Sequence, residues 1–235
     1  MCGIFGIILK DARHGPAPVR RAMDALFRLS ESRGKEAAGL AVLNATSLHV
    51  YKEAVRASVM IRRPRYRDLY DALLTADAGP RAVIGHSRLV TTGDQGNPFN
   101  NQPVVNSGVV GVHNGIIVND EALWAAHPGL PRRGRVDSEV IAALLRHSLV
   151  SGTSPSAAVR HTFGLLRGAA SIAMLFDDLD LALLATNNGS LYYRGGPLHA
   201  ALLFASEEYI LRQLTRRRPL RRDFGDAEIA PLRAG

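Results

Sequence analysis

The apolar run GIFGIIL at residues 3–9 constrains the fold more than any other segment of this 235-residue chain. The run has the length of a strand, and apolar residues occupy successive positions instead of alternating with polar ones. Such a strand has to be covered on both faces, because both of its rows of side chains avoid water. The sequence therefore predicts a sheet sandwiched inside the molecule, with one of its strands at the start of the chain.

Further short apolar runs alternate with helical patterns along the rest of the chain. The expected strands are GLAVL, SLHVYK, RAVIGHS, GVVGVH, ASIAMLF, LALLAT, SLYYR, ALLFAS and DAEIAPL. Turn residues predict a hairpin through Asn44–Thr46 and a second one, between LALLAT and SLYYR, at Asn187–Gly189. The expected helices begin at Pro18, after Pro64, at Asp137, at Ser154–Pro155 and near Glu207. This pattern fits one α+β domain over residues 1–235, with two antiparallel sheets and helices outside them.

The composition excludes several classes of protein. The single cysteine, Cys2, rules out an internal disulfide framework and a multi-cysteine metal site, so we expect a reducing cytoplasm and no metal or organic cofactor. No run approaches the eighteen or so apolar residues of a membrane span, and the first residues lack the pattern of a signal peptide.

Basic residues give the chain a formal net charge of +8, and nearly all of them are arginine. They are densest in Arg62–Arg67 and Arg216–Arg222. Such runs can attract nucleic acid or an acidic protein. Because no row of aromatic residues accompanies them, we favour solvated surfaces over a nucleic-acid-binding function, and we expect the second run to be available for docking a partner protein.

The position of Cys2 suggests a chemical role. A lone cysteine is ordinarily a small buried apolar residue. If Met1 is removed, however, the thiol and a free α-amine stand on the same residue. An α-amine titrates near pH 7.7 to 8.0, so it can act as the general base for its own thiol, directly or through a water.

Three later segments carry candidate partners for this thiol. In GHSRLVTTG, Arg88 follows an expected strand and suits the two-pronged recognition of a carboxylate. In HNGIIVN, the amide of Asn114 and the N–H of Gly115 form a plausible oxyanion hole at a strand end. In VDSEVIAALL, Asp137 starts a helix and suits an ammonium group. Taken singly, these residues read as a surface arginine, a hairpin turn and a helix N-cap.

Taken together, the segments resemble a family. CGIFGI, RGKEAAGLAV, GHSRLVTTG, VVGVHNGIIVN and DSEVIAALL stand in the order and approximate spacing of class II glutamine amidotransferase domains. The likeness is closest to the glutaminase domains of glucosamine-6-phosphate synthases and covers about residues 2–230. Where that family often has HTRWATHG, this chain has Leu89 in place of the tryptophan and Thr92 in place of the second histidine.

The resemblance implies an N-terminal-nucleophile hydrolase fold, a four-layer αββα sandwich of two antiparallel sheets with outer helices. It implies that Cys2 is the nucleophile, that Asn114 and Gly115 form the oxyanion hole, and that Arg88 and Asp137 hold the α-carboxylate and α-ammonium groups of glutamine. Thr91 matches a threonine of the family and is expected to contact the substrate. Arg33 and Gly34 are expected to lie beside the nucleophile.

The implied activity is hydrolysis of glutamine, with transfer of the ammonia to an acceptor. No acceptor-modifying segment is recognisable in the sequence, so we favour a synthetase or transferase partner subunit over a free-standing glutaminase or a fragment of a longer enzyme. Two alternatives remain open at this point. One is an N-terminal-nucleophile amidase that acts on another amide, and the other is a catalytically silent module that binds a partner.

Overall fold

The structure is a computed structural model that describes residues 2–10, 16–74, 81–89, 96–195, 201–225 and 227–234. Its strands form two antiparallel sheets. Sheet A contains β1 (Gly3–Leu9), β2 (Ala37–Leu43), β3 (Leu48–Glu53), β4 (Ala82–Arg88), β9 (Tyr192–Gly195), β10 (Ala201–Ala205) and β11 (Ile229–Pro231). Sheet B contains β5 (Val104–Asn106), β6 (Val109–Ile117), β7 (Gly168–Phe176) and β8 (Ala182–Thr186). The strand orders are β11-β9-β10-β1-β4-β2-β3 in sheet A and β5-β6-β7-β8 in sheet B.

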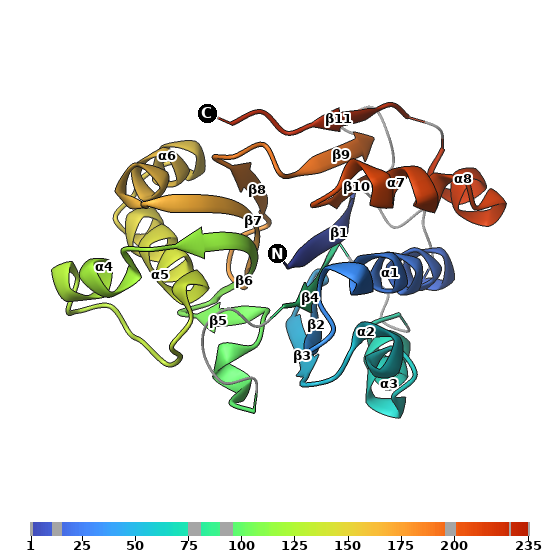
Figure 1. The fold of residues 1–235 in the computed structure, drawn as a ribbon, viewed down its shortest axis with the longest axis horizontal. Helices are drawn as coiled ribbons and strands as arrows, with labels where there is room; N and C mark the ends of the chain where they lie inside the picture. Colours follow the sequence, from blue (N-terminus) through green and yellow to red (C-terminus); the bar gives the residue numbers. More distant parts are fainter. Residues whose placement is uncertain are drawn as a thin grey trace.

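Helices cover the outer face of each sheet, so the layers follow the order helix, sheet, sheet, helix (Figure 1). Against sheet A lie α1 (Pro16–Ser30), α2 (Ala57–Met60), α3 (Pro64–Leu74), α7 (Glu208–Thr215) and α8 (Arg218–Phe224). Against sheet B lie α4 (Asp120–Ala126), α5 (Asp137–Val150) and α6 (Pro155–Leu165). The four-layer αββα sandwich expected from the sequence is confirmed. None of the helices in the described ranges combines the length and apolar character that crossing a membrane requires.

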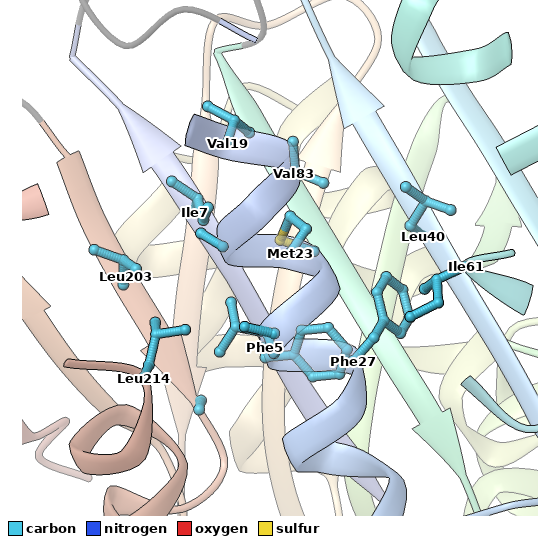
Figure 2. Packing of buried hydrophobic residues seen from close by; sticks show 14 of the residues in the cluster. Phe5, Ile7, Val19, Met23, Phe27, Leu40, Ile61, Val83, Leu203 and Leu214 are labelled. Carbon is cyan, nitrogen blue, oxygen red and sulfur yellow. The ribbon is translucent and has the colours of Figure 1, made fainter. Parts of the chain in front are cut away.

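The helix α1 covers the outer face of sheet A with one continuous apolar row. The row follows the spacing i, i+3, i+4, i+7 and i+8, and all of its members are buried: Val19, Ala22, Met23, Leu26 and Phe27. It packs on the outward side chains of β1, where the rings of Phe5 and Phe27 meet edge to face at 4.8 Å (Figure 2). The helix begins at Pro16, slightly before the expected Pro18.

The strand β1 is buried on both faces, as its sequence predicts. Phe5 and Ile7 point outward to α1, whereas Ile4 points inward to the cluster that separates the two sheets. On the other side of that cluster lie Val110 and Val112 of β6. The absence of alternation in GIFGIIL therefore reflects a central strand that lies between a helix layer and a second sheet.

The expected hairpin between LALLAT and SLYYR is wrong. These segments form β8 and β9, which belong to different sheets, so the connection after Thr186 crosses from sheet B to sheet A. The turn residues bond back to β7, since Asn187 donates to the Gly168 carbonyl at 3.0 Å and Ser171 donates to the Asn188 side chain at 3.0 Å. A turn signal predicts a reversal of the chain, but it does not determine which strands pair afterwards.

The run Arg216–Arg222 begins in the connection after α7, and from Arg218 on it lies in α8, a helix that the sequence reading did not identify. Leu220 and Phe224 of this helix are buried in the core against sheet A, while Arg218, Arg221 and Arg222 are exposed. The spacing of the arginines thus reflects the solvent face of an amphipathic helix.

A glycine in β1 provides a test of how tightly this strand packs against its neighbours on the inner face of sheet A. A Cβ atom on Gly6 would lie 2.4 Å from the Val83 carbonyl oxygen and 2.6 Å from the Phe204 ring. We expect Gly6→Ala to lower the free energy of unfolding by about 1–3 kcal/mol, because neither the backbone of β4 nor the buried ring can move freely. Urea unfolding followed by circular dichroism measures the change.

Gly164 in α6 is the matched control, because a Cβ atom there meets no atom within 4 Å. Gly164→Ala should leave stability unchanged or raise it by up to about 1 kcal/mol, as expected for alanine in a helix. Equal destabilisation by the two substitutions would contradict the packing described for β1.

Candidate active site

The space between the sheets changes from apolar to polar at one end of the sandwich. On each of five strands, the row of side chains that faces this space is apolar along most of its length and polar at its last position or positions. Towards the polar end these rows read Ile8, Ile4 and Cys2 on β1; Ala82, Ile84, His86 and Arg88 on β4; Val110, Val112 and Asn114 on β6; Leu175, Ala173 and Ser171 on β7; and Ala182, Leu184 and Thr186 on β8. We refer to this region as the polar end.

Cys2 lies at the polar end because β1 is paired on both sides. The β1–β4 register pairs Gly3 with Ser87, and its continuation by one residue places Cys2 beside Arg88. The thiol is partly buried and donates to the carbonyl oxygen of Leu89 at 3.4 Å. Burial raises the pKa of this thiol, the positive charge of Arg88 opposes the rise and the negative charge of Asp137 adds to it. The thiol therefore needs a base before it can act as a nucleophile at neutral pH.

Arg88 is only 4% exposed, and a neighbouring side-chain amide holds its guanidinium group in place. Its Nη1 atom donates to the Oδ1 atom of Asn101 at 2.5 Å. The segment after Arg33 supports the same backbone, because a Cβ atom on Gly34 would lie 2.1 Å from the carbonyl carbon of Arg88. The RGKEAAG loop thus packs against the end of β4, beside the candidate nucleophile. A buried arginine held in this way is preorganised to bind an anion.

Asn114 and Gly115 lie within β6, which continues to Ile117, and not at the end of a strand as the sequence suggested. Their pairing with Ser171 and Ala170 of β7 continues without a turn, so the local Asn-Gly signal is overridden by the neighbouring strand. Asn114 is 1% exposed, and within the described residues its Oδ1 atom has no hydrogen-bond partner.

Gly115 has a steric reason to be glycine. A Cβ atom at this position would lie 1.8 Å from the Ala169 carbonyl oxygen. Because backbone atoms of β7 occupy that space, no larger residue fits without separating the two strands. The backbone here therefore approaches its neighbour more closely than any side chain would allow.

Asp137 is the first residue of α5, but its carboxylate does not cap that helix. Its Oδ2 atom accepts a hydrogen bond from the N–H of Ile117 at 2.8 Å, and the Ser138 hydroxyl donates to its Oδ1 atom at 3.4 Å. The carboxylate therefore joins the start of α5 to the end of β6. Ser138, the next residue, bonds to the His113 ring at 3.0 Å, so Asp137 lies beside the part of β6 that carries Asn114 and Gly115.

Two histidines near this end are kept neutral by their surroundings. Burial, with smaller contributions from the charges of Arg88, His113 and Lys52, lowers the pKa of His86 to about 3. Burial also lowers the pKa of His113, although the Asp137 carboxylate opposes this effect. Neither ring nitrogen of His86 has a hydrogen-bond partner within the described residues.

The structure thus brings together most of the residues that the sequence singled out. Five of them lie at the polar end: Cys2 directly before β1, Arg88 on β4, Asn114 and Gly115 on β6, and Asp137 on α5. Thr91 lies outside the described residues.

The sequence reading missed three residues that connect these groups: Asn101, Gln102 and Ser138. The Oε1 atom of Gln102 accepts from the His113 N–H at 2.6 Å, and its Nε2 atom donates to the Ser138 hydroxyl at 3.1 Å. The only signal was their proximity to the quoted motifs, since Ser138 follows Asp137 directly. A loop such as NNQP carries no periodicity that would reveal contacts with both sheets.

Comparison with known proteins points to one family. The model of a glutamine amidotransferase domain matches residues 86–213 of the chain. A glutamine–fructose-6-phosphate aminotransferase (isomerizing) of Bradyrhizobium diazoefficiens is 35% identical over 192 residues, which are 81% of this chain and 29% of that protein. An amidophosphoribosyltransferase of Methanocaldococcus jannaschii is 30% identical over 187 residues, which are 76% of this chain and 36% of that protein.

Solved structures agree with this likeness at the level of the fold. The structure of an allosteric regulatory enzyme of purine biosynthesis matches with a TM-score of 0.67 and 23% identity, over 91% of this chain and 43% of that one. The glutamine phosphoribosylpyrophosphate amidotransferase of B. subtilis, complexed with ADP and GMP, matches with a TM-score of 0.64 and 21% identity over the same shares.

The buried His86 predicts a pH dependence of stability. Because the pKa of His86 is about 3 in the folded chain and near 6.5 when unfolded, the unfolded chain binds more protons between these values. Stability is therefore lost as the pH falls below about 6.5. We expect His86→Gln to lose about 1 kcal/mol less than the wild type between pH 7 and pH 5.5, as measured by urea unfolding at each pH.

The exposed His161 of α6 is the control for this experiment. His161→Gln should retain the pH dependence of the wild type. If His86→Gln and the wild type lose equal stability over this interval, the inferred neutrality of His86 is wrong.

Proposed function

The chain belongs to the class II glutamine amidotransferases, and from this we propose that it hydrolyses the side-chain amide of glutamine and supplies the ammonia to an acceptor. The observation that carries the proposal is the polar end between the sheets, where Cys2 stands beside the buried Arg88 and where the buried Asn114 of β6 supplies a side-chain amide whose Nδ2 atom can donate to an oxyanion. Among the described residues, this arrangement combines a nucleophile, an anion-binding group and an amide that is available for a ligand.

Removal of Met1 creates the nucleophile in this mechanism. Cys2 then carries both the thiol and the α-amine, and the amine accepts the thiol proton as the sulfur attacks the amide carbon of glutamine. This base is needed because burial raises the pKa of the thiol. A general base with a pKa close to the working pH is the most effective kind.

Glutamine is held by its α-amino-acid group. The Arg88 guanidinium binds the α-carboxylate and Asp137 binds the α-ammonium group, with Thr91 as a further contact. The hydrogen bond to Asn101 supports this role of Arg88, because it fixes the guanidinium before the substrate arrives. A requirement for both charges favours a free amino acid over an amide within a peptide.

Asn114 and Gly115 stabilise the oxyanion that forms when the thiolate adds to the amide carbon. The C–N bond then breaks, and the protonated α-amine gives its proton to the departing ammonia. Water attacks the γ-glutamyl thioester, the thiol leaves, and glutamate is released.

The acceptor belongs to another polypeptide in this proposal. The matched region spans 29% of the B. diazoefficiens aminotransferase and 36% of the M. jannaschii phosphoribosyltransferase, proteins whose names describe transfer to a sugar phosphate. We propose that residues 1–235 act as one glutaminase unit that passes ammonia to a synthetase or transferase subunit. The exposed arginines of α8 are the surface that we expect such a subunit to contact.

Replacement of the proposed nucleophile is the direct test. Cys2→Ala should abolish glutamate release from glutamine while the circular dichroism spectrum and unfolding midpoint remain those of the wild type. Incubation of the wild type with 6-diazo-5-oxo-norleucine, a reactive glutamine mimic, should label residue 2. Mass spectrometry of active protein that retains Met1, or turnover by Cys2→Ala, would reject the proposal.

Removal of the Asn114 amide tests the oxyanion hole. Asn114→Ala should lower kcat about 10²–10³-fold, because one donor to the oxyanion is lost, while the KM for glutamine changes much less. Steady-state assays of glutamate release measure both constants. An equal loss from Ser171→Ala, which alters the neighbouring position on β7, would assign the effect to general packing at the polar end.

A further inference from the structure

Lys52 lies on β3, the edge strand of sheet A, and belongs to none of the family motifs in the sequence. It pairs with Gly39 of β2, and its side chain is partly buried. Its Nζ atom donates to two backbone carbonyl oxygens, of Asn101 at 2.7 Å and of Pro103 at 2.8 Å. Lys52 therefore holds the segment Asn100–Pro103, which we call the NNQP segment, at two points.

The NNQP segment lies directly on sheet A at this place. A Cβ atom on Gly39 would be 2.3 Å from the Gln102 carbonyl oxygen and 2.8 Å from the Pro103 ring. Only glycine at position 39 permits this approach. Because Gly39 is also the strand partner of Lys52, the lysine lies beside the place where the segment packs on the sheet. The segment is therefore bound to sheet A both by close packing on Gly39 and by the two hydrogen bonds from Lys52.

Within the described part of the chain, the same segment contacts the three elements that carry the proposed substrate-binding and oxyanion groups: β4, β6 and the start of α5. Asn101 accepts from Arg88, so Lys52 and Arg88 hold the backbone and the side chain of one residue. Gln102 bonds to both the N–H and the carbonyl group of His113, the residue before Asn114, at 2.6 and 3.1 Å.

Two further contacts reach the start of α5. Gln102 donates to the Ser138 hydroxyl at 3.1 Å, and Asn100 accepts from the Arg135 N–H at 2.9 Å. Asp137 lies between Arg135 and Ser138 in the sequence. The NNQP segment thus joins the two sheets and α5 through hydrogen bonds that place the two substrate clamps, Arg88 and Asp137, relative to Asn114.

We propose that Lys52 is a positioning residue for glutamine, which acts by seating the NNQP segment and thereby fixing Arg88 relative to Asn114 and Asp137. This inference rests on the proposed function. Lys52 does not contact the substrate, so its removal weakens glutamine binding by disordering the groups that do.

The electrostatic surroundings agree with such a role. Burial lowers the pKa of Lys52 to about 8, and the charge of Arg88 contributes to this effect while that of Glu139 opposes it. The Lys52 ammonium group compensates for this cost by donating to two carbonyl oxygens, and without it those carbonyl groups would lose their donor. Removal of the side chain therefore frees the segment and does not merely remove a surface charge.

The test combines kinetics with hydrogen exchange. Lys52→Gln cannot donate to both carbonyl groups, and we expect it to raise the KM for glutamine about tenfold, which corresponds to about 1.4 kcal/mol, with kcat within about threefold of the wild type. Lys52→Arg, which retains several donors, should return the KM towards the wild-type value. Lys10→Gln is the matched control, since this exposed lysine follows the opposite end of β1 from Cys2.

Hydrogen exchange supplies a readout that does not depend on activity. The N–H groups of His113 and Arg135 are bonded by Gln102 and Asn100, so peptides that contain them should exchange faster in Lys52→Gln than in the wild type or Lys10→Gln. A raised KM without faster exchange, or faster exchange with an unchanged KM, overturns the proposal.

A double-mutant cycle tests whether Lys52 and Asn101 affect the KM through the same segment. Asn101→Ala removes the acceptor of Arg88, and because both changes act through one segment, their effects on KM should be clearly less than additive. Lys52→Met, which likewise cannot donate to the two carbonyl groups, replaces Lys52→Gln in the cycle if the latter does not fold. Additive effects would show that Lys52 acts by another route. A wild-type protein that releases no glutamate would reject the proposed function itself, whereas normal turnover with an unchanged KM in Lys52→Gln rejects only this inference.

Discussion

The pairing of β1 on both sides is the constraint on which the rest of the site depends. This strand lies between β4 and β10, with α1 on one face and sheet B on the other. The burial of its apolar side chains fixes both its depth and its register, because a shift by one residue would exchange its two faces. The position of Cys2 at the polar end, beside Arg88, follows directly from that register. A thiol on a loose chain end would have no defined neighbours.

The polar end solves an electrostatic problem that this position creates. Burial favours the neutral forms of the Cys2 thiol, His86, His113 and Lys52, as the direction of each pKa shift shows. Arg88 nevertheless keeps its charge at nearly complete burial, with the amide oxygen of Asn101 bonded to its guanidinium. Amide and carbonyl groups of the NNQP segment thus accept the hydrogen bonds that Arg88 and Lys52 would otherwise donate to water. Fixed dipoles of this kind need little rearrangement when a charged ligand arrives.

Sequence reasoning succeeded where a residue pattern reports burial and failed where it reports only a local turn. The expected strand at residues 3–9 and the apolar row of α1 are confirmed, because each pattern reflects which faces of an element are covered. The turn residues Asn187–Gly189 were read as a hairpin, although the chain crosses between sheets there because Leu191 is buried in the cluster between them. Asn114 and Gly115 were placed at a strand end, whereas pairing with β7 extends β6 beyond them.

By itself, the sequence determined the sandwiched position of β1, the αββα layers and the candidate residues Cys2, Arg88, Asn114 and Asp137. The position of β1 follows from side-chain burial, whereas the αββα layers and the set of candidate residues are what the resemblance of the motifs to a known family implies. Only the tertiary structure decided how the candidates are held: that Asp137 bonds to β6 and does not cap its own helix, and that Lys52 and Arg88 share Asn101. Those contacts join residues far apart in the chain through backbone carbonyl groups and single side chains. Every residue possesses a carbonyl group, so no pattern of residue types can reveal which of them a buried lysine will bind.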